Sequence, residues 1–296
     1  MWFKNARLFQ LNEAFSMNAE QLSDALKGDA LKACAPMEAV SKGWVSPFGS
    51  DSELFVLQSG DALLFTLGIE EKVLPAAVVN HQLSQQLDSI KAESGQKPGR
   101  KQQTDMKQQL MLEMLPQAFV KPKAISAYID LKLGLLVVDC ASQNAAEDLV
   151  SQLRQTLGSF KASAFGPSSS MAQVLTQWVL HATGDGGFQL DNEIVLETLD
   201  DSKGVVRGRN IAHLDDQMKL HIDNGYLVTQ LGLSFNDRVE LVLGHDMGIK
   251  KVKFTDLVLD QLDDESIESE WQLLDSRFAA QTPARAKRMA KRLARG

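Results

Sequence analysis

The chain has 296 residues, of which 44% are hydrophobic and 23% charged, and its formal net charge is -7 at pH 7. This composition is ordinary for a globular protein, and the length allows one large domain or two smaller ones. No apolar run reaches the roughly 18 residues that cross a bilayer, and the N-terminal segment lacks the apolar stretch of a signal peptide. Cys34 and Cys140 are the only cysteines, which is typical of a reducing cytoplasm, where disulfides are rare.

The first half of the chain predicts strands and helices of one α+β unit. In chain order the patterns predict a strand at 2–11, a helix at 18–28, turn residues at 43–50, a hairpin at 53–72 that turns at Ser59–Gly60–Asp61, helices at 75–93 and 104–115, a hairpin at 124–142 and a helix at 144–158. Thr104 is the predicted N-cap of its helix, and Pro116 is predicted to end it. The two middle helices therefore form a helical hairpin between two strand pairs.

The second half alternates strands and helices in the same way. After a connection at 165–170, the patterns predict a helix at 171–183, strands at 193–200 and 205–212, a helix at 215–225, strands at 226–235, 238–245 and 248–254, and a helix at 255–262. The segments 71–83 and 250–262 share five of thirteen residues at matching positions. That similarity is compatible either with duplicated architecture or with chance.

These patterns together predict an α+β fold with two related sheet-containing domains. The predicted units are a central domain of 1–75 plus 119–164, an inserted helical hairpin of 76–118, a second domain of 165–276 and a basic tail of 277–296. The tail carries seven basic residues and no acidic one, and we expect it to be disordered when free.

Common catalytic motifs are missing from the sequence. It contains no G-x-x-x-x-G-K-[ST] phosphate loop, no G-x-G-x-x-G after a strand and no G-x-S-x-G elbow. The histidines are dispersed and typical of surface or half-buried positions: His81, His181, His213, His221 and His245. We therefore expect no metal, no cofactor and no enzymatic activity.

One constellation keeps a nuclease as the alternative. Many metal-dependent nucleases place an Asp and a Glu-x-Lys on adjacent strands, where the carboxylates hold Mg²⁺ and the lysine positions the attacking water. Asp61, Glu70 and Lys72 supply these residue types along one predicted hairpin. The pattern is short and common, and Asp61 falls in the predicted turn and not beside Glu70, so a solvated hairpin end is the favoured interpretation.

The basic charge of this acidic chain is segregated. Residues 91–123 carry seven basic and three acidic residues, whereas 256–275 carry eight acidic residues and no basic one. Arg207 and Arg209 alternate on one predicted strand, so both are expected on one face. Lys251 and Lys253 alternate in the same way on another, next to Lys250. Such pairs suit the phosphates of duplex DNA, although lysines also solubilise exposed strands, and a protein-interaction scaffold remains a third possibility.

A series of short motifs gives the chain a family resemblance. In order they are MWFKNARLFQL, GWVSPFGS, EEKVLP, EMLPQAF, GLLVVDCAS, LGSF, GFQL, VVRGRN and IKKVKF. Their order and spacing over roughly residues 1–270 resemble the bacterial recombination-associated RdgC family. The resemblance implies a nucleoid protein that binds double-stranded DNA without sequence preference. It also implies a ring-shaped homodimer with a positively lined hole that restrains the RecA recombinase.

The resemblance also assigns roles to residues of this chain. The helical hairpin becomes a tip that meets its two-fold mate, with Leu115 and Phe119 at the dimer contact. The residues then expected at DNA are Lys72, Lys97, Arg100, Lys101, Lys121, Lys123, Arg207, Arg209, Lys250, Lys251 and Lys253, with Lys91 beside them. Gln117 and Asn210 stand where the family pattern leads us to expect further bases, which weakens the predicted inner wall at those two places.

Overall fold

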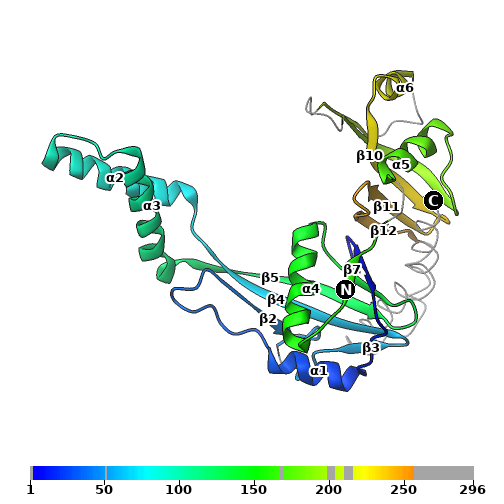
Figure 1. The fold of residues 1–296 in the computed structure, drawn as a ribbon, viewed down its shortest axis with the longest axis horizontal. Coiled ribbons are helices and arrows are strands. Elements are labelled where there is room, and N and C mark those ends of the chain that lie inside the picture. The colour runs from blue at the N-terminus through cyan, green and yellow to red at the C-terminus, as the bar shows by residue number, and fades with distance from the viewer. Residues whose placement is uncertain (1–2, 51, 167–169, 199–203, 210–215, 257–296) are drawn as a thin grey trace.

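In a computed structural model, the described part of the chain forms an arch built from two antiparallel sheets and six α-helices (Figure 1). The structure describes residues 3–50, 52–166, 170–198, 204–209 and 216–256. Asn210, the basic tail and most of the predicted helix at 255–262 lie outside these ranges. Among the described residues, no helix combines the length and apolar character needed to cross a membrane.

The first sheet forms the middle of the arch. Its strand order is β2–β4–β5–β6–β1–β7, with β3 paired to one end of β4. The strands are β1 (Arg7–Leu11), β2 (Val40–Val45), β3 (Leu57–Ser59), β4 (Ala62–Val73), β5 (Phe119–Asp130), β6 (Leu135–Val138) and β7 (Ala162–Ala164). Helices α1 (Ala19–Gly28) and α4 (Gln143–Leu157) contribute buried leucines to a core cluster with alternate residues of β4 and β5, so they cover one face of this sheet.

A helical arm lies between β4 and β5 in the chain, where the sequence predicts the inserted hairpin. It consists of α2 (Ala76–Ser94), α3 (Arg100–Met114) and a 3-10 turn (Leu115–Gln117), and it projects beyond the ends of the two strands (Figure 1). Gly95 ends α2 in the left-handed conformation that glycine adopts without strain.

The start of α3 differs from the prediction. The helix begins at Arg100 after Gly99, so Thr104 is an interior residue and not the N-cap. Its Oγ1 donates a hydrogen bond to the Arg100 carbonyl oxygen (3.1 Å). The helix begins directly after the Pro98–Gly99 pair, because proline and glycine interrupt regular structure at that point.

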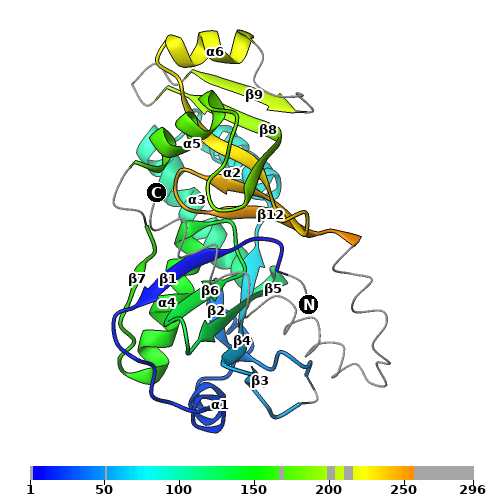
Figure 2. The same cartoon turned by 90° about the vertical axis from the view of Figure 1, so that its right-hand side faces the viewer.

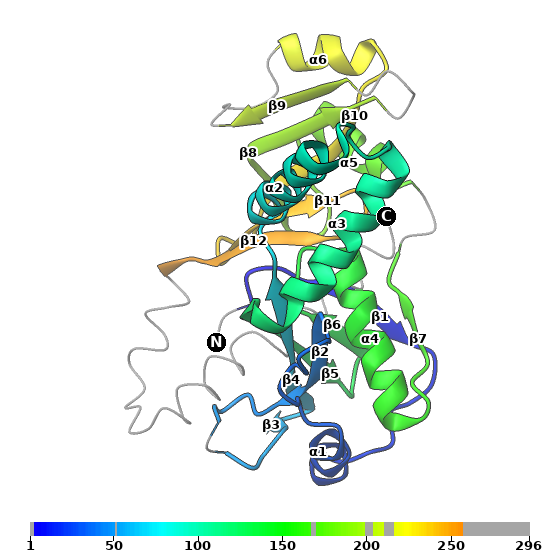
Figure 3. The ribbon, with the colours of Figure 1, turned by 90° about the vertical axis from the view of Figure 1, so that its left-hand side faces the viewer.

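The second sheet stands at the other end of the arch. Its strand order is β12–β11–β10–β8–β9. The elements of this half are α5 (Met171–Leu180), β8 (Phe188–Glu197), β9 (Val205–Arg209), α6 (Asp216–Asp223), β10 (Leu227–Phe235), β11 (Val239–Gly244) and β12 (Ile249–Phe254). Figures 1 and 3 together place the helical arm and this sheet on the same side of the first sheet, with Figure 2 giving the opposite side view.

The segment at 43–50 was predicted as turn residues, and this prediction is wrong for its first part. Gly43, Trp44 and Val45 belong to β2, and the turn begins only after them. Trp44 is 1% exposed, and its indole Nε1 donates to Thr156 Oγ1 (2.8 Å). A Cβ at Gly43 would lie 2.4 Å from the Leu31 Cα, so close backbone packing, not a turn, requires this glycine.

The two sheets are joined by a buried arginine. Arg7 on β1 is 4% exposed, and its Nη2 donates to Asp246 Oδ2 (2.7 Å) and to the Ala141 carbonyl oxygen (2.7 Å). Its Nη1 donates to the Asp246 carbonyl oxygen (3.2 Å). Ala6 and Ile249 exchange backbone hydrogen bonds beside it (2.8 and 3.0 Å). One guanidinium therefore holds backbone and carboxylate groups from both halves of the arch.

Candidate nucleic-acid interface

The helical arm carries exposed cations around the connection between its two helices. Lys91, Lys97, Arg100 and Lys101 are all exposed, and this connection forms the outer end of the arm (Figure 1). Lys97 Nζ lies 3.8 Å from Asp88 Oδ1, a loose contact. Lys91, Arg100 and Lys101 make no ion pair with any residue that the structure describes. The outer end of the arm is therefore positively charged.

The predicted basic residues of the β4–β5 strand pair lie on two different faces: Lys121 and Lys123 are on one face and Lys72 is on the other. Residues directly opposite in an antiparallel pair share a face, and Glu71 is opposite Lys121 while Ile69 is opposite Lys123. Lys123 Nζ donates to Glu71 Oε2. That hydrogen bond, with the charges of Lys123 and Lys121, lowers the pKa of Glu71.

Lys72 lies on the other face of this strand pair and has a local role. Its ammonium group donates to the carbonyl oxygens of Ala35 (2.7 Å) and Pro36, which lie in the loop before β2. The first sheet therefore does not bring Lys72 together with Lys121 and Lys123.

In the second sheet the basic residues lie on the two outermost strands. Arg207 and Arg209 are both exposed on β9, which confirms their predicted common face. Lys251 and Lys253 are also exposed on β12, because the intervening Val252 and the following Phe254 pack against the core. However, a β-bulge lies between Lys250 and Lys253, and Lys251 has a φ of 54°. The regular alternation predicted for this strand is therefore interrupted.

A glutamate joins the two edge strands of this sheet. Glu193 on β8 accepts hydrogen bonds from Lys251 Nζ, one of them 2.7 Å long, and Arg209 Nε lies 3.8 Å from its Oε1. The predicted DNA-binding residues Arg209 and Lys251 are thus brought together, but around a carboxylate. No sequence pattern predicts this contact, since Lys251 is 58 positions from Glu193 and the three residues lie on three different strands.

Of the two residues predicted at the dimer contact, one is exposed and the other is buried. Phe119 is 85% exposed at the start of β5, opposite Val73, at the point where the arm joins the strand. Leu115 is 8% exposed and packs within the arm. Phe119 therefore lies at the root of the arm, not at its outer end, and of the two residues only Phe119 offers its side chain to a partner.

The residues of the nuclease alternative are not assembled. Asp61 precedes β4 and Glu70 is near its far end, nine residues later, so they are separated by roughly 30 Å at about 3.3 Å per residue. Glu70 Oε2 accepts a hydrogen bond from the Cys34 backbone N–H (2.9 Å). Among the described residues, no group of three or more His, Cys, Asp or Glu side chains is placed to hold a metal ion.

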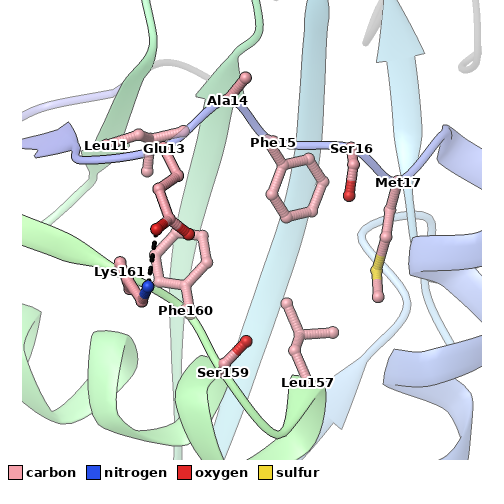
Figure 4. A pocket seen from close by; sticks show the side chains of 10 residues that line it. All are labelled: Leu11, Glu13, Ala14, Phe15, Ser16, Met17, Leu157, Ser159, Phe160 and Lys161. Atoms are coloured by element: carbon pink, nitrogen blue, oxygen red, sulfur yellow. Dashed lines mark hydrogen bonds and ion pairs between the residues drawn. The ribbon is translucent and has the colours of Figure 1, made fainter.

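A small pocket lies away from these cations, between the β1–α1 connection and the end of α4 (Figure 4). Phe15, Leu157 and Phe160 form its apolar wall, and Lys161 Nζ donates to Glu13 Oε1 (2.6 Å) at its rim. The charged residues that line it are already paired with each other. The pocket is an edge of the core of the first sheet, and its lining residues form no catalytic arrangement.

Comparison with known proteins gives one consistent result. Residues 1–295 match the model of the family described as "Putative exonuclease, RdgC". The chain is 34% identical to the recombination-associated protein RdgC of Xylella fastidiosa (strain 9a5c) over 280 residues, which is 94% of this chain and 92% of that protein. It is 30% identical to the protein of the same name from Salmonella paratyphi B over 282 residues, 95% and 93% of the two chains.

Proposed function

This chain belongs to the RdgC family of recombination-associated proteins, and on that premise we propose that it is a homodimeric ring that encloses double-stranded DNA without sequence preference. We assign it a role in restraining RecA-dependent recombination at the nucleoid, without a catalytic step and without a cofactor. The arm with its exposed cations lies at one end of the arch, and the second sheet with its two cationic strands lies at the other (Figure 1).

The observation that carries this proposal is the pair of cationic edge strands in the second sheet. Arg207 and Arg209 are exposed on β9, and Lys251 and Lys253 are exposed on β12. Duplex DNA presents a phosphate charge about every 1.7 Å of its axis, so a surface of this kind gains affinity from phosphates of any sequence. The one aromatic residue of these two strands, Phe254, packs against the core and not beside the exposed cations. This favours contacts with the duplex backbone over stacking on the nucleobases of a single strand.

Two observations support the ring: the shape of the protomer and its exposed apolar residue. Two arches related by a two-fold axis enclose a hole when the arm region of one meets the arm region of the other and their second sheets also meet. Phe119 is a large apolar side chain left 85% exposed near the arm, and exposed aromatic residues are frequent anchors of protein interfaces. We place the contact that closes the ring at this residue.

A gel-shift series with and without Mg²⁺ separates the proposal from its alternatives. We expect duplexes of equal length and different sequence to be retarded equally and to be recovered intact after incubation with Mg²⁺. Shortened DNA in the Mg²⁺ lanes would instead support a nuclease, and the absence of any retardation would support a protein-interaction scaffold. A strong preference for one sequence, beyond what DNA shape explains, would contradict the ring.

The salt dependence of binding tests the second sheet directly. Replacing Arg207 and Lys253 together by alanine should flatten the slope of log affinity against log salt by on the order of two units, because each cation that meets a phosphate releases about one counterion. Neither side chain forms an ion pair with a described residue, so neither has to leave a carboxylate partner before it can bind a phosphate. The control is a double replacement of Lys27 and Lys161, which are paired with Glu53 and Glu13 on the first domain. An equal slope in both double variants would remove β9 and β12 from the binding surface.

A further inference from the structure

The contact between Glu193, Arg209 and Lys251 has a consequence for how tightly DNA is held. We propose that Glu193 is an affinity-limiting residue: it occupies the place of a backbone phosphate between two cations in the free protein, and DNA must displace it. This inference rests on the proposed function, since it needs a phosphate-binding surface on the second sheet. Glu193 would then lower the affinity for DNA from within a surface whose other named residues are cations.

The geometry of the contact matches what a phosphate would make. Lys251 Nζ donates to both carboxylate oxygens of Glu193, and Arg209 Nε lies 3.8 Å from Oε1. A carboxylate and a phosphodiester both present two oxygen atoms that share a negative charge, and both are bound by lysine and arginine through charge-assisted hydrogen bonds. The side chains of Arg209 and Lys251 remain 76% and 51% exposed, so a phosphate can reach them from solvent.

Three local features of the sheet bring this carboxylate to its two cations. Glu193 is directly opposite Arg209 in the β8–β9 pair. Lys251 reaches Glu193 from the other edge strand, and its positive φ lies at the bulge that interrupts β12. Gly232 on β10 lies at a second irregularity, where an added Cβ would come within 3.1–3.2 Å of Glu193 atoms. A side chain at position 232 would therefore press on Glu193, and glycine leaves it room.

Neighbouring residues show that the contact is specific to one position. Glu197 lies on the same strand and carries the same charge, but it forms no ion pair with a residue that the structure describes. On β9, Arg207 is opposite Val195, not opposite an acidic residue. Glu240 on β11 is opposite Lys253, and no ion pair joins those two side chains. Glu193 alone among these groups holds two predicted DNA contacts.

The effect should appear in binding and hardly in folding. The Glu193 side chain is 27% exposed and its two partners are more exposed. Ion pairs in contact with solvent contribute little to stability, so Glu193→Gln should fold as the parent does. DNA binding, unlike folding, should depend on Glu193. A phosphate that forms ion pairs with Arg209 and Lys251 leaves the Glu193 carboxylate nearby and unpaired. Removing that repulsion and that competition should strengthen binding by roughly 3–10-fold at moderate salt.

Salt dependence gives a second and independent readout. When DNA displaces Glu193, the freed carboxylate takes up cations from solution, which offsets part of the counterion release from DNA. Glutamine takes up none. The slope of log affinity against log salt should therefore become steeper by up to about one unit in Glu193→Gln.

Glu197→Gln is the matched control, since it removes the same charge from the same strand. We will titrate a short labelled duplex with the parent, Glu193→Gln and Glu197→Gln over a range of salt concentrations, with circular dichroism to establish folding. The inference requires the Glu193 variant to bind more tightly than the Glu197 variant and with the steeper slope. In an Arg209→Ala, Lys251→Ala background, its advantage should disappear.

Each other outcome has a definite meaning. Equal tightening in both glutamine variants would show a general charge effect and would overturn the role of Glu193. Unchanged or weaker binding in Glu193→Gln would show that the carboxylate organises the two cations for DNA, and this also overturns it. A parent protein that fails to bind duplex at any salt concentration would instead refute the proposed function, and the inference with it.

Discussion

Arg7→Met is expected to lower the free energy of unfolding by about 3 kcal/mol, because it removes the donor shared by the two halves of the arch. The substitution leaves the carbonyl oxygens of Ala141 and Asp246 without their partners. It also leaves the Asp246 carboxylate without the guanidinium 2.7 Å away. Methionine fills much of the volume of the arginine side chain. The decrease in the free energy of unfolding should therefore come more from the lost polar contacts than from a cavity.

Thermal unfolding measures this directly. For a chain of this size a loss of about 3 kcal/mol corresponds to a fall in the melting temperature of roughly 6–12 °C. Arg238→Met, at an exposed position before β11, is the control and should melt within a degree or two of the parent. If the two variants melt alike, Arg7 does not hold the junction of the sheets.

A second variant reaches the same contact from the other side. Gly248 packs against the guanidinium, and a Cβ there would lie 2.5–2.8 Å from Arg7 atoms. Because Arg7 is buried and held by four hydrogen bonds to Ala141 and Asp246, it has little room to move away. Gly248→Ala should therefore destabilise the parent, and should do so much less when Arg7 is already methionine.

Acid should weaken this junction, and the sign follows from Asp246. Burial alone would raise the pKa of Asp246, but the hydrogen bonds from Arg7 and from the Gly248 backbone, with the charge of Arg7, lower it overall. The unfolded chain then binds the proton more readily than the folded one. The contribution of Asp246 to the free energy of unfolding is therefore complete above the ordinary pKa of an aspartate, and it is lost as the pH falls through the lowered pKa of the folded protein. Arg7→Met should lose part of this acid dependence.

Local signals in the sequence were sufficient for most elements of the fold. The hairpin turn at Ser59–Gly60–Asp61 and the one at 131–134 lie where turn residues interrupt two apolar runs, and both are present. The helical arm follows from Pro75 before one helix and Gly95 after it. These features depend on residues next to each other in the chain, and such patterns survive without knowledge of the tertiary structure.

The contacts that define the candidate site depend on distant residues. Arg7 and Asp246 are 239 positions apart, and Arg7 reads in the sequence as an ordinary charge within an amphipathic strand. Glu193 and Lys251 lie on β8 and β12, and two irregularities in strand register occur between those strands. Most of the predicted basic residues are exposed, although Lys72 and Lys250 are partly buried. The carboxylate partners of these residues depend on strand order and register, which a single sequence does not specify.

Phe119→Ser is expected to open the ring while leaving each subunit folded. The side chain is 85% exposed, so replacing it removes apolar area from the surface and not from the core, and the melting temperature of the subunit should change by no more than about 2 °C. In the proposed dimer the same residue of each protomer meets near the two-fold axis. An aromatic anchor there buries a large area for a small entropy loss, so its removal should cost most of that contact.

The topology of the DNA shows whether the ring is closed. A closed ring on a circular duplex has no end from which to slide, so parent complexes on circles should outlast those on short linear duplexes of equal composition. Opening the contact at Phe119 should remove most of this difference in lifetime while leaving affinity for linear DNA nearly unchanged, because the cations of the second sheet are untouched. Leu220→Ser is the matched control: its side chain is a similarly exposed apolar residue, 59% exposed on α6, and it should preserve the difference. A circle-to-linear ratio that Phe119→Ser leaves unaltered would mean that the ring does not close at this residue.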